Sequence, residues 1–309
     1  MIFIICTIGI SDGIGSYKIT GLGDINVNTR ATTSAIPTTA AEPDLTALEW
    51  RNIGPFNGGR GTSVVGHPTD PQVFWFGHSS GGLWKTEDAG QYWLPVGEGQ
   101  FNYGSVGAIA VYEKNPDILY VGLGEPNMRQ SVSWGDGMYK STDGGETWQH
   151  IGLESLKQIA RIRIHPDNPD VVYVAALGHL YSENPERGLY KSTDGGGSWD
   201  QILAPEVRGK TIGVVDVAMD PSDPNLLYAA TYQRQRKAFG FHGGGPGSGL
   251  HKSTDAGETW KQVSGLNEET KKYMSGHSGT YGWVFGQMRV DPNDENRVYT
   301  LGLWINVST

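Results

Sequence analysis

Cysteine, long apolar runs and clusters of basic residues are scarce in this sequence, and each scarcity excludes a class of protein. Cys6 is the single cysteine among 309 residues, so no disulfide can form within the chain. No apolar run approaches the roughly 20 residues that a membrane-spanning helix needs. The formal net charge is −9 and the densest basic stretch is Arg234–Lys237, so we expect no nucleic-acid partner.

We expect residues 1–47 to lie outside the folded domain. Residues 1–10 are apolar, but they lack a basic segment and a small-residue cleavage site, so a signal-peptide remnant and a buried start both remain open. Residues 28–47 are rich in Thr, Ala and Pro, a composition typical of a flexible linker. The folded domain is therefore predicted over residues 48–309.

An eight-residue motif, the Asp box, recurs four times at intervals of about 50 residues. Each copy holds an Asp-x-Gly turn and closes on a tryptophan; the four pairs are Asp88 and Trp93, Asp143 and Trp148, Asp194 and Trp199, and Asp255 and Trp260. The carboxylate can accept backbone N–H groups across the bend, and glycine takes the positive φ. The motif lacks the alternating oxygen ligands of a calcium loop. We expect these Asp and Trp residues to be structural and expect no metal.

A second repeat, a Pro/Asn/Asp turn between two apolar strands, precedes each Asp box, so each unit has four strands. This period predicts an all-β fold, a β-propeller of four-stranded antiparallel blades. The blades are predicted at about 61–97, 104–152, 158–203 and 213–264, with a partial fifth at 281–309. The first strand of this fifth blade should begin at Val284, and the fifth blade should lack a third strand. Residues 49–54 match the outer strands of other blades, and we expect the chain to be a piece of a larger propeller. The alternative is a five-bladed ring that closes with one incomplete blade.

The Asp boxes, together with residues 50–60 and 104–111, resemble the large bacterial Asp-box (BNR) propeller proteins. That family is related to the sortilin-type (VPS10-like) sorting-receptor domain and is often labelled glycosyl hydrolase. The resemblance covers roughly residues 48–304 and implies a secreted or cell-envelope protein. It implies no particular reaction, because the same fold occurs in sialidases, xyloglucanases and sortilins.

The sequence departs from each of these relatives at the residues that carry their activity. Residues 160–166 do not match the stretch that begins the sialidase arginine triad. Ser79 stands where the resemblance to two-propeller xyloglucanases would place an Asp, and the cysteines of sortilins are absent. No relative's catalytic set can therefore be transferred.

The irregular loops at the blade ends opposite the Asp boxes are the expected site of binding or catalysis. Glu125 and Asp136 bracket one such loop and form the candidate catalytic pair for glycoside hydrolysis, which needs two carboxylates. The alternative is an ion pair of Glu125 with Arg129 and a turn capped by Asp136. On the inner strands, Arg161 and Asp216 should form an ion pair between adjacent blades. The candidate ligand-binding residues are Arg129, Trp134, His179, Tyr181, Glu183, Arg187, Arg234, Arg236 and His242.

Two functions remain open at this point. The first is an extracellular or envelope propeller that binds a glycan, peptide or protein partner through this loop side. The alternative is a glycoside hydrolase that uses carboxylates on the same side. Neither function requires a cofactor, and we expect none.

Overall fold

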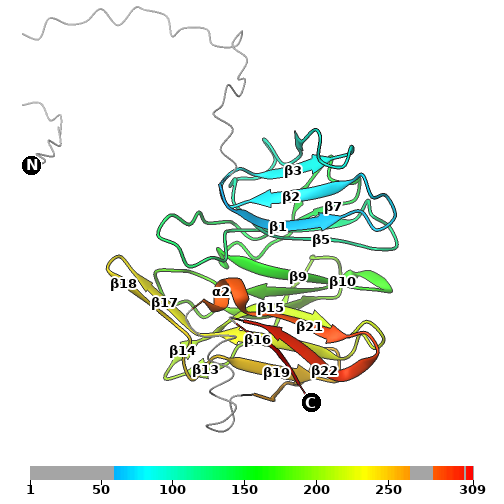
Figure 1. Ribbon diagram of the computed structural model, residues 1–309. Helices are drawn as coiled ribbons and strands as arrows, with labels where there is room; N and C mark the ends of the chain where they lie inside the picture. Colours follow the sequence, from blue (N-terminus) through cyan, green and yellow to red (C-terminus); the bar gives the residue numbers. More distant parts are fainter. Residues whose placement is uncertain (1–58, 265–280, 303, 309) are drawn as a thin grey trace, which may run out of the picture. The chain divides into compact units, whose positions relative to one another are not determined.

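The chain folds into consecutive antiparallel sheets, each built from one continuous segment of sequence (Figure 1). The computed structural model describes residues 59–264, 281–302 and 304–308. All of them belong to one unit, Gly54–Thr309. The expectations for the apolar segment at 1–10, the linker at 28–47 and the outer strand at 49–54 lie outside the described residues.

Four of the sheets have four strands in sequence order. The first contains β1 (Gly61–Gly66), β2 (Phe74–His78), β3 (Leu83–Thr86) and β4 (Leu94–Pro95). The second contains β5 (Val106–Val111), β6 (Leu119–Leu123), β7 (Met138–Ser141) and β8 (Gln149–His150). The third contains β9 (Ile159–His165), β10 (Asn168–Ala176), β11 (Gly188–Ser192) and β12 (Asp200–Leu203). The fourth contains β15 (Gly213–Met219), β16 (Leu227–Tyr232), β19 (Gly249–Ser253) and β20 (Lys261–Gln262).

The fifth sheet differs from the sequence prediction at both ends. It contains β21 (Gln287–Asp291), β22 (Asp294–Leu301) and a short third strand, β23 (Ile305–Val307), which was not predicted. Val284 lies in a helical turn, α2 (Gly282–Phe285), so β21 begins later than expected. Gly282 packs so closely on Tyr232 that a Cβ would come within 2.5 Å of the ring. The periodicity of a short apolar run does not distinguish a strand from such a helical turn.

Two small hairpins also interrupt the predicted pattern. Strands β13 (Glu206–Val207) and β14 (Lys210–Thr211) pair between the third and fourth sheets. Strands β17 (Arg234–Lys237) and β18 (Gly240–Gly243) pair within the long loop between β16 and β19 (Figure 1). Apart from these additions, the predicted β-propeller of four-stranded antiparallel blades is confirmed.

The apolar faces of neighbouring sheets form the core. Strand β6 is buried at all five positions, and the innermost strands β1, β5, β9, β15 and β21 pack against one another in that order. Gly122 permits the close approach of the second and third sheets, because a Cβ there would lie 2.4 Å from Ile159 Cγ2. Burial of these apolar residues supplies the main driving force for folding.

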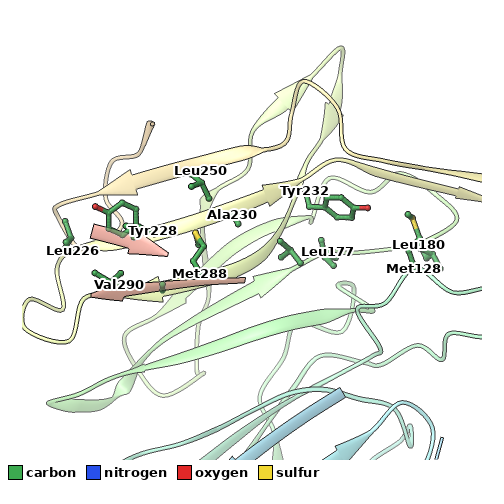
Figure 2. Close-up of a cluster of buried hydrophobic side chains, with 13 residues drawn as sticks. Met128, Leu177, Leu180, Leu226, Tyr228, Ala230, Tyr232, Leu250, Met288 and Val290 are labelled. Carbon is green, nitrogen blue, oxygen red and sulfur yellow. The ribbon is translucent and has the colours of Figure 1, made fainter. Parts of the chain in front are cut away.

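One core cluster lies between the fourth and fifth sheets, and one end of it reaches the long loops (Figure 2). Tyr228 and Tyr232 of β16 pack with Met288 of β21, and the loop residues Met128 and Leu180 extend the cluster at the Tyr232 end. The base of the loops is thus anchored in the hydrophobic core.

The lysine before each Asp box packs over an aromatic ring from the second strand of the same sheet. The ammonium lies 5.3 to 5.9 Å from the ring centre, within the range of a cation–π contact. The pairs are Lys85 with Trp75, Lys140 with Tyr120, Lys191 with Tyr173, and Lys252 with Tyr228. The two sequence repeats therefore meet in space within each blade.

Each Asp box is a turn held by its own polar side chains. Ser141 Oγ accepts from the backbone N–H four residues on at 2.9 Å and donates to Asp143 Oδ1 at 2.8 Å. Asp143 also accepts from the backbone N–H of Thr147 at 2.9 Å and from its hydroxyl at 2.5 Å. The copies at Asp194 and Asp255 repeat these bonds. The hydroxyl bond is the largest cause that lowers the pKa of each of these three carboxyls to about 2.

The closing tryptophans of two Asp boxes also reach the preceding sheet. Trp148 donates from Nε1 to the carbonyl of Val96 at 2.8 Å, and Trp199 donates to that of Ile151 at 2.8 Å. Trp93 and Trp260 instead donate to a glycine carbonyl of their own turn, each at 3.1 Å. Each Asp-box turn thus stabilises its own blade. Two of the four turns also join that blade to the preceding one.

We expect the melting temperature to fall steeply as the pH is lowered from about 4 to about 2. The folded pKa values of Asp143, Asp194 and Asp255 lie below the unfolded value, so their stabilisation is present above about pH 4 and disappears as the pH falls through about 2. Scanning calorimetry should show a weaker decline for D143N/D194N/D255N. The matched control is Asp200→Asn, at an exposed position of β12. An equal decline in the triple variant would assign the effect to other carboxyls.

Candidate functional site

Three long loops meet at the ends of the sheets opposite the Asp boxes, and we call this side the loop face. Its segments are residues 124–137 between β6 and β7, residues 177–187 between β10 and β11, and the β17–β18 hairpin. Gln130 joins all three, since its side-chain amide donates to the carbonyl of Ala238 at 3.1 Å and its own carbonyl accepts from Tyr181 Oη at 3.0 Å. Residues far apart in sequence are therefore held together on this side.

A cavity of about 610 Å³ opens on the loop face, and we call it the loop pocket. Its walls carry Arg60, Arg129, Arg236, Phe241 and Tyr281. The loop residues Met128, Gln130 and Ser131 complete the lining. No carboxylate is among these described lining residues, so the walls combine cationic and aromatic groups.

The three guanidinium groups of the loop pocket have different surroundings. Arg60 donates from Nε and Nη2 to the two oxygens of Glu125 at 2.6 and 2.7 Å, and this bond raises the pKa of Arg60. Arg236 stacks 5.3 Å from the ring centre of Phe241. Arg129 has no hydrogen bond or ion pair with any residue that the structure describes. Two of the three cations thus lack a neutralising carboxylate among the described residues.

Glu125 and Asp136, the candidate catalytic pair, are both buried and hydrogen-bonded. Glu125 is 0% exposed, and Asn127 adds a bond of 2.9 Å to the two from Arg60. Asp136 accepts from Asn102 Nδ2 at 2.7 Å and from Tyr139 Oη at 3.0 Å. In this conformation Glu125 cannot contact a substrate. Its ion-pair partner is Arg60 and not Arg129, which corrects the alternative interpretation.

Burial also shifts the pKa of Tyr139, the tyrosine that contacts Asp136. The pKa of Tyr139 is raised to about 12, chiefly by burial. Tyr139 therefore stays protonated and donates to Asp136 Oδ2, while Asp136 Oδ1 is buried without a partner among the described residues. The catalytic role of Glu125 and Asp136 stays a prediction, and their contacts are those of structural carboxylates.

Three predicted ligand-binding residues, Trp134, His179 and Tyr181, form a partly exposed aromatic group on the loop face, which we call the aromatic platform. Trp134 and Tyr181 are 47% and 45% exposed, although both are large apolar side chains. Trp134 stacks on His179 at 6.2 Å between ring centres, and His179 is held by Ser155 and Ser182. The Tyr181 hydroxyl bonds to Gln130, which lines the loop pocket. Such a platform suits the apolar face of a sugar ring.

The remaining predicted residues have other environments. Arg187 is 3% exposed and bonds to Glu183 at 3.1 Å and to the carbonyls of His179 and Ser182. Arg234 is also 3% exposed and donates only to protein acceptors among the described residues. This geometry favours structural roles for Arg187 and Arg234. His242 is exposed on β18, outside the lining of the loop pocket.

Sequence analysis did not single out Arg60, Phe241 or Tyr281, which line the loop pocket. Phe241 belongs to the β17–β18 hairpin, a stretch that the sequence marked as a candidate binding loop without indicating a hairpin or a role for Phe241. On the inner strands, Arg161 and Arg163 are two residues apart and therefore share one face of β9, a signal that the sequence did contain. The predicted ion pair is confirmed, since Arg161 Nε lies 2.8 Å from Asp216 Oδ1.

Within the part of the chain that the structure describes, no three His, Cys, Asp or Glu side chains gather as a metal-binding group. Among the same residues, no helix has the length and apolar character needed to cross a membrane.

Comparison with known proteins shows which family the chain matches and which solved structures share its fold. The family model described as "Sortilin, neurotensin receptor 3" matches residues 136–301, more than half of the chain. A solved GH74 xyloglucanase from Xanthomonas campestris is 20% identical, with a TM-score of 0.55 over 77% of this chain and 35% of that protein. A GH74 enzyme from Niastella koreensis gives 23% identity and the same TM-score over 80% and 36% of the two chains. These likenesses show the propeller fold.

Curated relatives are xyloglucanases of low sequence identity. A probable oligoxyloglucan-reducing end-specific xyloglucanase of Neosartorya fischeri is 23% identical over 71% of this chain and 25% of its own length. A xyloglucanase of Paenibacillus sp is 24% identical over 77% and 26% of the two chains. A xyloglucanase of Acetivibrio thermocellus is 23% identical over 84% and 33%. The chain thus spans about a quarter to a third of the length of the relatives it matches.

Proposed function

The chain belongs to the Sortilin-Vps10 family, and we propose that it is a propeller segment of a carbohydrate-active protein of the xyloglucanase type. The observation that carries this proposal is the similarity to xyloglucanases along 71–84% of the chain. In this proposal the loop face binds a glycan, and the protein acts outside the cell or in its envelope, where such polysaccharides occur.

The aromatic platform suits a glycan. Trp134 and Tyr181 present half-exposed rings, the Tyr181 hydroxyl bonds to Gln130 of the loop pocket, and Arg129 in that pocket has donors that no described residue accepts. Aromatic rings supply contact area while polar groups fix the orientation of a sugar. The similarity to xyloglucanases favours a glycan over a protein or peptide partner, which the same residue types could also bind.

Binding and hydrolysis place different demands on the described residues. Glycoside hydrolysis needs two carboxylates with access to the scissile bond. Glu125 and Asp136 would first have to lose Arg60 and the Asn102–Tyr139 pair, respectively. We therefore propose glycan binding for the described residues and hydrolysis as an activity of the whole protein.

Replacement of Trp134 or Tyr181 by Ala should weaken the binding of a xyloglucan oligosaccharide about tenfold or more, because loss of one stacked ring costs on the order of 1–2 kcal/mol. Isothermal titration calorimetry on the full chain would measure this. The matched control is Tyr92→Ala, since Tyr92 is 73% exposed but lies in an Asp box at the other end of its sheet. Equal affinity for the parent and both loop-face variants would contradict glycan binding at the platform. Release of reducing ends by the parent chain would report on hydrolysis separately.

A further inference from the structure

Two further cavities share lining residues with the loop pocket or with each other. A connecting cavity of about 330 Å³ shares Arg60 and Arg129 with the loop pocket. It also shares Thr62 and Arg161 with a larger groove of about 830 Å³ lined by the innermost strands, which we call the inner groove. We call these three neighbouring spaces, which share lining residues, the hollow.

Arginine dominates the charged lining of this hollow. Six of the chain's twelve arginines line it: Arg60, Arg129, Arg161, Arg163, Arg236 and Arg289. No lysine is among the described lining residues, although the chain also has twelve lysines. The planar guanidinium fork matches a carboxylate or a similar oxyanion in a way that an ammonium does not. This selective placement points to recognition of an anion.

The inner groove holds three guanidinium groups around one buried carboxylate. Asp216 is 0% exposed; its oxygens lie 2.8 Å from Arg161 Nε and 3.8 Å from Arg289 Nη1. Arg163 donates to the carbonyl of Ile162 and has no carboxylate within ion-pair distance among the described residues. Burial lowers the pKa of Arg163 to about 10; the charges of Arg161 and Arg289 add to this effect and that of Asp216 opposes it. Among the described residues, Arg163 is therefore the guanidinium of these three that has no carboxylate partner.

Two carboxylates also line the inner groove, but neither forms an ion pair with an arginine among the described residues. Glu113 is exposed in the turn after β5, and Asp220 Oδ1 accepts three bonds from Ser222 and Asp223 in its own turn. The chain as a whole carries a net charge of −9, so it repels anions in general. An anion would therefore bind only where the arginines gather, and it would relieve the repulsion among them.

We infer that the hollow binds a saccharide that carries anionic groups, with its sugar rings at the aromatic platform and an oxyanion at Arg163 and Arg289. This inference rests on the proposed glycan binding and adds the chemical class of the glycan. The oxyanion can be a uronic acid carboxylate or a sulfate ester, because both present paired oxygens to a guanidinium group.

The test compares three probes by calorimetry on the full chain: an oligogalacturonate, a sulfated oligosaccharide and a neutral xyloglucan oligosaccharide. We expect at least one anionic probe to bind about tenfold more tightly than the neutral one, with an affinity that falls as salt is added. The stronger of the two anionic probes identifies the oxyanion. Equal or weaker binding of both anionic probes would overturn the inference and leave the proposed function intact.

Two variants and a control locate the site. Arg289→Gln should remove most of the preference for the anionic probe without affecting the neutral one; Arg289 is 53% exposed, so the fold is not at risk. R163Q/R289Q should remove the preference completely, with the fold checked by circular dichroism. The control is Arg297→Gln, on β22 of the same sheet, 51% exposed and outside the hollow. An unchanged preference in R163Q/R289Q would overturn the assignment.

A peptide with a free terminal carboxylate serves as the fourth probe. Tighter binding of this peptide than of every saccharide would overturn the saccharide class. Absence of binding by all saccharides would instead contradict the proposed function itself, so the two failures are distinguishable.

Discussion

Replacing Arg234 by Met is expected to lower the free energy of unfolding by about 3–5 kcal/mol. The guanidinium of Arg234 is buried and donates to the carbonyl of Pro126 at 2.9 Å, to that of Gly178 at 3.0 Å and to that of Leu177 at 3.3 Å. It also bonds to the side-chain oxygen of Gln158. Methionine fills part of the volume but leaves these acceptors without a donor, and each unsatisfied buried acceptor costs about 1–3 kcal/mol.

The cost of burying the cation does not reverse this expectation. Burial lowers the pKa of Arg234 to about 9, with the charge of Arg187 as a second cause, so the fold does oppose the charge. Hydrogen bonds to four acceptors from three chain segments offset the desolvation cost of the guanidinium. All four acceptors stay buried when the donor is removed. Unfolding in urea would measure the change. Arg236→Met, two residues along the same strand but only partly buried, should cost less than about 1 kcal/mol. A change below about 1 kcal/mol for Arg234→Met would mean that water replaces the guanidinium.

Replacing Asp216 by Ala is the second change with a large expected effect, a loss of about 3–5 kcal/mol. Asp216 is 0% exposed and joins three sheets, because it accepts from Arg161 of β9 and from the backbone N–H of Met288 in β21 at 2.8 Å. Alanine leaves Arg161 and the Met288 amide without their acceptor and removes the buried carboxylate that faces Arg161 and Arg289. Denaturant unfolding with an unchanged m-value would isolate the change in stability.

Asp170→Ala provides the comparison for Asp216. The Lys140–Asp170 ion pair also joins adjacent sheets, at 3.0 Å, but Asp170 is 51% exposed. Solvent screens such a pair, so its loss should cost at most about 1 kcal/mol. Equal effects of the two substitutions would mean that burial does not determine the contribution of these inter-sheet ion pairs.

The sequence by itself determined the features that arise from short-range chemistry. The Asp boxes were predicted as turns because Asp143, Ser141 and Thr147 lie within a few residues and form their bonds locally. The repeat length predicted four-stranded blades, and the regular spacing of the blades predicted the pair of Arg161 and Asp216. Where the repeat weakens, in the fifth sheet, the prediction missed β23 and placed a strand over α2.

Only the tertiary structure decided which charged side chains are available to a ligand. Glu125 and Arg234 stand in polar loops, but one is paired with Arg60, 65 positions away, and the other is buried against carbonyls 56 to 108 positions away. Likewise, the arginines of the hollow come from different sheets and converge only when the inner strands pack together. Turn and strand propensities depend on neighbouring residues, whereas the burial and charge environment of a side chain depend on distant segments that the sequence pattern does not pair.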